Sequence, residues 1–239
     1  MGDAPDAPRP QRPLPVDAVL FDLDGTLADT APDLAAALNR VRADRGLAPV
    51  SISELRSSCS HGARGLIGTG MGVAPDHRDY VMLRDAFLAH YESALCVDTT
   101  LFGEIDAVLG EIEARSLKWG IVTNKATRYT LRLLDLLGLS ARPGVVVCGD
   151  TTPHTKPHPA PLLAAAVALD VAPERCVYVG DAERDIAAGV AAGMRTIIAR
   201  YGYIDAREQP DAWAADGVIE NPTDLLAWLP GVSPGTRPR

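Results

Sequence analysis

The sequence predicts an α/β fold in which a parallel sheet, covered by helices on both faces, carries an inserted all-helical domain. From about residue 100 onward, short apolar segments alternate with helical patterns, which is typical of strands joined by crossover helices. An earlier apolar segment, 16–21, precedes a block of purely helical patterns at 31–97. Hydrophobic residues make up 47% of the 239-residue chain, so it can bury the core that this fold needs.

The N-terminal part of the chain supplies one strand and then helices. Residues 16–21 form an apolar run typical of a buried strand. Apolar residues recur at helical spacing over 34–41, behind Pro32, which suits a first helical turn. The glycine-rich segment 58–75 predicts a loop with a short helix, and 83–95 follows as an amphipathic helix.

The later part of the chain alternates between helices and strands. Expected strands are 118–123, 144–149, 176–181 and 195–200. Expected helices are 105–112, 127–138, 159–170, 182–193 and a last short one at 221–229. Gly138 and Gly193 end two of these helices, because glycine adopts the left-handed conformation at little cost.

These patterns divide the chain into a core domain, 16–30 with 98–230, and a helical domain, 31–97. Residues 1–15 are rich in proline and lack apolar periodicity, so we expect a disordered tail, and 231–239 form a second tail.

Composition limits the partners and the compartment. The net charge of −8 argues against nucleic-acid or anionic-membrane binding. The four cysteines are far apart, which favours reduced thiols, and neither a signal peptide nor a membrane-spanning run is evident. We expect a cytoplasmic protein; the sequence leaves open whether it is a monomer or a homodimer.

Polar side chains follow four of the expected strands. They are Asp22 and Asp24, Thr123 and Asn124, Lys156, and Asp181 and Asp185. In parallel α/β folds, ligands bind at the carboxyl ends of the strands. A carboxylate can attack phosphorus, Mg²⁺ accepts carboxylate and carbonyl oxygens, and a threonine hydroxyl and a lysine can hold phosphate oxygens. The pattern therefore favours phosphoryl transfer through an aspartate.

These residues resemble the four motifs of the haloacid dehalogenase (HAD) superfamily of phosphatases. The matching elements are "DLDGT" (22–26), Thr123, Lys156 before Pro157, and "GDAERD" (180–185), in the family's order. The resemblance spans residues 16 to about 200 and implies a Rossmann-like core with a small helical cap that closes over the site.

The resemblance also implies roles for the acidic residues. Asp22 would be the nucleophile, and Asp24 the general acid and then the general base. The Asp22 and Asp181 carboxylates and the Asp24 backbone carbonyl would hold Mg²⁺. Asp185 would support the metal shell and help to position Lys156.

The phosphate of the substrate would be bound by Thr123 and Lys156. Backbone N–H groups near Gly25 and Asn124 would assist them. Lys125 follows directly, and a surface position is its simplest interpretation.

In the expected cap, Arg64 is a candidate for contact with an anionic or polar part of the substrate. The alternative is a solvated arginine on a connecting loop, with His61 beside it at the surface.

The branch of the superfamily depends on small differences. Asp24 argues against haloalkanoate dehalogenases, and the absence of lysine from 31–97 argues against phosphonoacetaldehyde hydrolases. The resemblance implies an activity of the phosphoglycolate phosphatase type, which converts 2-phosphoglycolate to glycolate and phosphate. The alternative is the similar group of N-acetylmuramic acid 6-phosphate phosphatases, which act in cell-wall recycling. The segments 42–50, 61–66 and 200–204 look more like the latter.

Two other functions stay open. Sugar phosphomutases share the nucleophile and the acid. A phospho-accepting signalling domain also gathers acids, a threonine and a lysine at strand ends, but it lacks the equivalent of Asp24 and the helical insertion.

Overall fold

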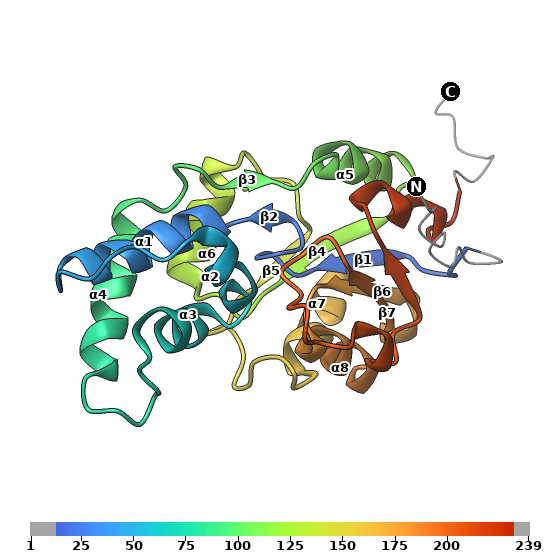
Figure 1. Cartoon of the computed structure of the whole chain (residues 1–239). Coiled ribbons are helices and arrows are strands. Elements are labelled where there is room, and N and C mark those ends of the chain that lie inside the picture. The colour runs from blue at the N-terminus through green and yellow to red at the C-terminus, as the bar shows by residue number, and fades with distance from the viewer. Residues whose placement is uncertain (1–12, 232–239) are drawn as a thin grey trace, which may run out of the picture.

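Six parallel strands form the central sheet of the computed structural model, which describes residues 13–231 (Figure 1). Their order is β5-β4-β1-β6-β7-β8. The bounds are β1 Ala18–Phe21, β4 Lys118–Val122, β5 Val145–Val147, β6 Cys176–Gly180, β7 Arg195–Ala199 and β8 Gly217–Ile219. The predicted α/β class is confirmed, and β8 is an additional edge strand that the sequence patterns did not predict.

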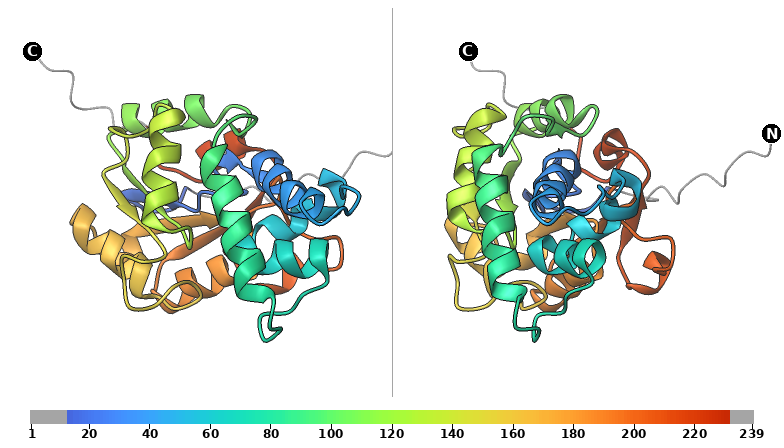
Figure 2. Two further views of the ribbon diagram at one scale, coloured as in Figure 1. Left: turned by 90° about the vertical axis from the view of Figure 1, so that its left-hand side faces the viewer. Right: turned by 60° about the vertical axis from the view of Figure 1, so that its left-hand side comes forward.

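Helices cover both faces of this sheet (Figure 2). They are α5 Ile105–Ala114, α6 Thr127–Leu136, α7 Ala160–Leu169 and α8 Glu183–Ala191. Alternate side chains of β1 belong to two cores: Val19 and Phe21 pack with residues of α5 and α6, whereas Ala18 and Leu20 pack with residues of α7 and α8. The central strand is therefore buried on both faces, which explains its continuous apolar run.

Four helices are inserted between β2 (Ala28–Asp29) and β3 (Thr100–Leu101), two short strands that pair antiparallel. They are α1 Ala31–Ala43, α2 Ile52–Cys59, α3 Gly62–Met71 and α4 Tyr80–Ser93. Figure 1 shows them gathered together on one side of the sheet. We call residues 31–97 the helical insert.

The glycine-rich segment 58–75 is more helical than its composition predicts. It contains the end of α2 and all of α3, whereas the sequence indicated a loop with a short helix. A Cβ atom on Gly70 would lie 2.2 Å from Leu38 Cδ2, so this glycine lets α3 pack closely on α1. Burial of Leu66 and Ile67 in the core also stabilises the helix despite its low intrinsic propensity.

Asp33 fastens the two connections of the helical insert to each other. From the first turn of α1 its buried carboxylate accepts hydrogen bonds from the backbone N–H groups of Val97, Asp98 and Thr99. The Thr99 hydroxyl donates a further bond at 2.6 Å. Both crossings between sheet and insert are thus joined by one charged group.

The ends of the described chain also contribute contacts. The last predicted helix is a 3₁₀ helix, Pro222–Ala227, with Asn221 and Asp224 forming a capping box. The Leu14 N–H, which lies in the expected N-terminal tail, donates to the Trp228 carbonyl.

Residues 1–12 and 232–239 of the two expected tails lie outside the described residues. Among residues 13–231, no helix combines the length and apolarity required to cross a membrane.

Candidate active site

The predicted site residues converge at the carboxyl edge of the central sheet. Asp22 follows β1, Thr123 follows β4 and Asp181 follows β6; these three strands are neighbours. Lys156 lies in the segment between β5 and α7 and reaches the same edge. Parallel strands thus bring together residues more than 150 positions apart in the sequence.

Lys156 lies at the centre of this arrangement and its side chain is fully buried. Its Nζ is 2.9 Å from Asp22 Oδ1 and 2.8 Å from Asp185 Oδ1. It also donates to the Val122 carbonyl at 3.0 Å and to the Tyr178 hydroxyl at 2.6 Å. A buried ammonium needs such partners, and here two of them are carboxylates that it neutralises. Tyr178 is a contact that the strand pattern alone did not reveal.

Asp181 joins the two carboxylates that contact this ammonium in a buried acidic cluster. Asp22, Asp181 and Asp185 each offer one oxygen atom, and the three oxygens lie within 4.8 Å of one another. Burial raises the pKa of Asp22 to about 6, although Lys156 opposes the shift. Burial, followed by repulsion from Asp185 and Asp22, raises the pKa of Asp181 to about 7. Clustered oxygen donors whose mutual repulsion is only partly compensated fit a hard divalent cation such as Mg²⁺.

Gly25 leaves the space in which Asp181 lies. Its φ angle is +86°, and a Cβ atom would lie 2.2 Å from Asp181 Oδ2. Asp181 also accepts hydrogen bonds from the Thr26 hydroxyl and the Tyr203 N–H, at 3.2 and 2.9 Å. The Gly25 N–H itself donates to the Ala28 carbonyl. The turn after β1 therefore requires glycine both for its conformation and for the approach of the acid.

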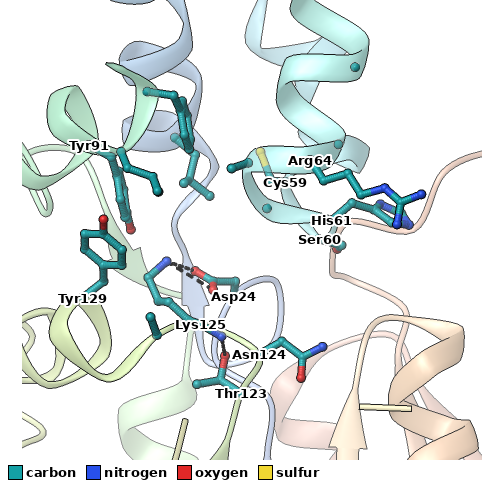
Figure 3. Close-up of a pocket in the computed structure, with 18 of the residues that line it drawn as sticks. Asp24, Cys59, Ser60, His61, Arg64, Tyr91, Thr123, Asn124, Lys125 and Tyr129 are labelled. Carbon is teal, nitrogen blue, oxygen red and sulfur yellow. Dashed lines mark hydrogen bonds and ion pairs between the residues drawn. The ribbon is translucent and has the colours of Figure 1, made fainter. Parts of the chain in front are cut away.

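The prediction of a surface position for Lys125 is wrong. Its side chain is 8% exposed, and its Nζ is 2.9 and 3.2 Å from the two carboxylate oxygens of Asp24 (Figure 3). Asp24 also accepts from the Thr30 hydroxyl at 2.6 Å. Burial alone would lower the pKa of Lys125, but the Asp24 carboxylate reverses this and raises it, so the side chain stays charged. Two features of the sequence mark Lys125 as a candidate site residue: it directly follows a strand-end motif, and the chain has only three lysines.

Thr123 and Asn124 differ in what they contact. The Thr123 hydroxyl is buried and accepts from the Lys125 N–H at 3.2 Å. The Asn124 side chain makes two bonds of 3.0 Å to the backbone of Lys156, one as donor and one as acceptor. Asn124 therefore holds the Lys156 segment against the end of β4.

A cavity of about 950 Å³ connects the sheet edge with the helical insert. Asp22, Asp24 and Thr123 line its floor. From the insert come mainly apolar and aromatic side chains together with Arg64 and His61, both of which are exposed. The insert residues that line it are Leu34, Cys59, Ser60, His61, Gly62, Ala63, Arg64, Gly65, Gly68, Thr69, Val73, Ala74, Pro75, Phe87, Leu88 and Tyr91.

In Figure 3, Arg64 and His61 project from the helical side, above the level of Asp24 and Lys125. The insert also touches the sheet edge directly. The Ser60 hydroxyl donates to Asp181 at 3.1 Å, and Arg184 donates to the Ser60 carbonyl at 2.6 Å.

The arrangement of strand-end motifs agrees with comparisons to known proteins. A sequence profile for haloacid dehalogenase-like hydrolases matches residues 19–199. The chain belongs to this family. The resemblance inferred from the four motifs is thereby confirmed.

Two curated relatives cover nearly the whole chain. An N-acetylmuramic acid 6-phosphate phosphatase of Pseudomonas putida is 40% identical over 208 residues, which are 87% of this chain and 93% of the relative. A phosphoglycolate phosphatase of Xanthomonas campestris pv. campestris is 42% identical over 221 residues, covering 91% and 97%.

A solved structure shows the same fold. The crystal structure of a predicted phosphoglycolate phosphatase from Haemophilus somnus superimposes with a TM-score of 0.79 at 25% identity. The match covers 89% of this chain and 97% of that one.

Proposed function

We propose that this hydrolase is a Mg²⁺-dependent phosphomonoesterase that cleaves a small phosphorylated metabolite through an aspartyl phosphate on Asp22. The observation that carries the proposal is the pairing of Asp22 with the buried Lys156 ammonium, with a second acid, Asp24, two residues away. A nucleophile and a separate proton donor are what hydrolysis through a covalent intermediate requires.

Asp22 acts as the nucleophile. Its Oδ1 is held by the Leu23 N–H at 2.7 Å and by Lys156 at 2.9 Å, so the carboxylate has a fixed orientation. Attack on phosphorus breaks the bond to the leaving oxygen. Water then breaks the new bond between Asp22 and phosphorus and releases phosphate.

The second acid and the phosphate ligands complete the reaction. Asp24 protonates the leaving oxygen and then accepts a proton from the attacking water. The Thr123 hydroxyl and Lys156 bind phosphate oxygens, with N–H groups near Gly25 and Asn124, and stabilise the charge that develops on them.

Mg²⁺ would be held by the carboxylates of Asp22 and Asp181 and by the backbone carbonyl of Asp24, with Asp185 in support. When bound, it supplies positive charge that offsets repulsion between the carboxylates and the phosphate. Asp185, at 2.8 Å from Lys156, keeps that ammonium in place.

The proposed division into domains assigns 16–30 and 98–230 to the core and 31–97 to a cap that closes over the substrate. The contacts of Ser60 with Asp181 and Arg184 support closure, because they join the insert to the sheet edge. We also propose a cytoplasmic location, which the four free cysteines support.

The substrate is a small phosphate ester, of which 2-phosphoglycolate is one candidate. N-acetylmuramic acid 6-phosphate is the other, and the volume of the cavity favours it. A cavity of about 950 Å³ is at the upper end of the usual range for small ligands, and it far exceeds the volume of glycolate, the two-carbon acid that 2-phosphoglycolate carries. Phe87, Leu88 and Tyr91 on its wall suit a larger group with apolar surface.

The test is phosphate release from both esters, and from hexose phosphates, compared by kcat/KM with and without Mg²⁺. We expect turnover only with Mg²⁺ and a preference for the larger ester. An isomerised hexose phosphate as product would support a phosphomutase instead. Stable labelling by a phosphodonor, with turnover of none of the esters, would support a signalling domain and overturn the proposal.

A further inference from the structure

Lys125 occupies a position that the roles above do not explain. It follows Thr123 and Asn124 at the end of β4, and its ammonium points towards Asp24 and the side of the helical insert on which Tyr91 lies (Figure 3). It is one of three lysines in the chain, and it is nearly buried at the base of the cavity. A buried ammonium is costly unless it is paired, so its contacts indicate what it is for.

One side of Lys125 faces Asp24. The ammonium contacts both carboxylate oxygens, at 2.9 and 3.2 Å, and the hydroxyl of Thr30, the residue just before the insert, donates to one of them. Two donors from different segments thus fix the rotation of this carboxylate. Without Lys125, Thr30 alone would restrain it, and the carboxylate could rotate about its side-chain torsions.

The other side of Lys125 faces the insert. Its Nζ lies 4.7 Å from the centre of the Tyr91 ring, which belongs to α4. This is a cation–π distance, and the contact is desolvated because Tyr91 is buried. Tyr91 is itself packed against Phe87 and Tyr129. The ammonium therefore lies between an acid of the sheet edge and an aromatic ring of the insert.

We propose that Lys125 is a positioning residue that holds the Asp24 carboxylate in the orientation for proton transfer to the leaving oxygen, and that Tyr91 holds Lys125. The inference rests on the proposed role of Asp24 as general acid. It explains why an ammonium at the sheet edge is directed at Asp24 and an aromatic ring of the insert. Closure of the insert would then fix the orientation of the Asp24 carboxylate as well as enclose the substrate.

The test uses leaving groups of different basicity. Aryl phosphates with good leaving groups, such as p-nitrophenyl phosphate, need little protonation, whereas phenyl and benzyl phosphates need more. We expect Lys125→Gln to lower kcat/KM at least about tenfold more for benzyl than for p-nitrophenyl phosphate. This value is an order-of-magnitude expectation for partial loss of general acid catalysis. The ratio kcat/KM reports the phosphorylation step, in which the leaving oxygen departs.

Three variants serve as controls. Lys125→Arg keeps the charge, so its kcat/KM for benzyl phosphate relative to p-nitrophenyl phosphate should be close to that of the wild type. Lys118→Gln, at the opposite end of β4, should leave it unchanged. Tyr91→Phe keeps the ring and should resemble the wild type, whereas Tyr91→Leu should shift the ratio in the same direction as Lys125→Gln. Urea unfolding of each variant shows whether it is folded.

The outcomes separate the two proposals. An equal loss on all esters, or none, in folded Lys125→Gln would overturn the positioning role. If Asp24→Asn itself loses activity equally on all esters, the assignment of Asp24 as general acid fails instead.

Discussion

The two ends of the cavity are built differently. At the sheet edge, the charged side chains of Asp22, Lys156 and Asp185 are buried and lie within 3 Å of a partner. On the helical side, Arg64 and His61 are exposed, and their neighbours are largely apolar or small residues of α3 and α4. The first end is constrained by parallel strands, and the second by the packing of an insertion.

This difference indicates that the sheet edge and the helical side serve different functions, catalysis and substrate recognition. Strand ends are fixed by pairing on both sides, so they hold reacting groups accurately. Helices and loops of an insertion can vary without disturbing the sheet, so they suit recognition of the part of the substrate that differs between enzymes. We therefore expect substitutions at the sheet edge to alter turnover or folding, and those on the helical side to alter substrate preference.

The largest effect should come from Asp22→Asn. An amide cannot form the proposed aspartyl phosphate, so kcat should fall by at least about 10³-fold on every ester. The measurement is phosphate release under saturating substrate. Asp17→Asn, an exposed acid just before β1, should retain normal turnover. Substantial turnover by Asp22→Asn would show that Asp22 is not the nucleophile.

Lys156→Met should be the most damaging change for stability. It leaves Asp22 and Asp185 buried without their shared ammonium, and removing one partner of a buried ion pair costs about 3–5 kcal/mol. Urea unfolding without Mg²⁺ measures the loss. Adding Asp185→Asn should recover part of it, because one unpaired charge is removed. An unchanged unfolding free energy would mean that the cluster does not depend on Lys156.

Mg²⁺ should stabilise the wild type, because it would bind the folded cluster only. At 100 times the dissociation constant, ligand binding adds about 2.7 kcal/mol to the free energy of unfolding. A thermal melt with and without Mg²⁺ measures this. Asp181→Asn should abolish the response, whereas Asp106→Asn, on the surface, should preserve it. An equal response in both variants would place the cation elsewhere.

The smallest effect should come from Arg64→Ala. Its side chain is exposed in the helical part of the cavity, so KM for the true substrate should rise about tenfold, roughly 1.4 kcal/mol, with little change in stability. Arg78→Ala, on the same insert and 89% exposed, is the matched control. If both variants have wild-type kinetics, Arg64 is a solvated surface residue and does not contribute to substrate recognition on the helical side.

Local patterns allowed much of the fold and the sheet edge to be predicted. The apolar run before Asp22 and the alternation after residue 100 depend on neighbouring residues, and both correspond to strands in the structure. The glycine-rich segment was harder, because Gly70 acts through its contact with Leu38 and not through its own propensity. Lys125 was assigned to the surface for the same reason: its partners lie far away in the sequence.

By itself the sequence determined the class of fold, the order of the four motifs and the family, because each depends on residues close together or at strand ends. Only the tertiary structure decided which charges are paired. It placed Lys125 on Asp24, Tyr91 beside it, and Tyr178 against Lys156. The physical reason is that pairing follows from distance and burial in the folded chain, and neither is encoded in the spacing of residues along it.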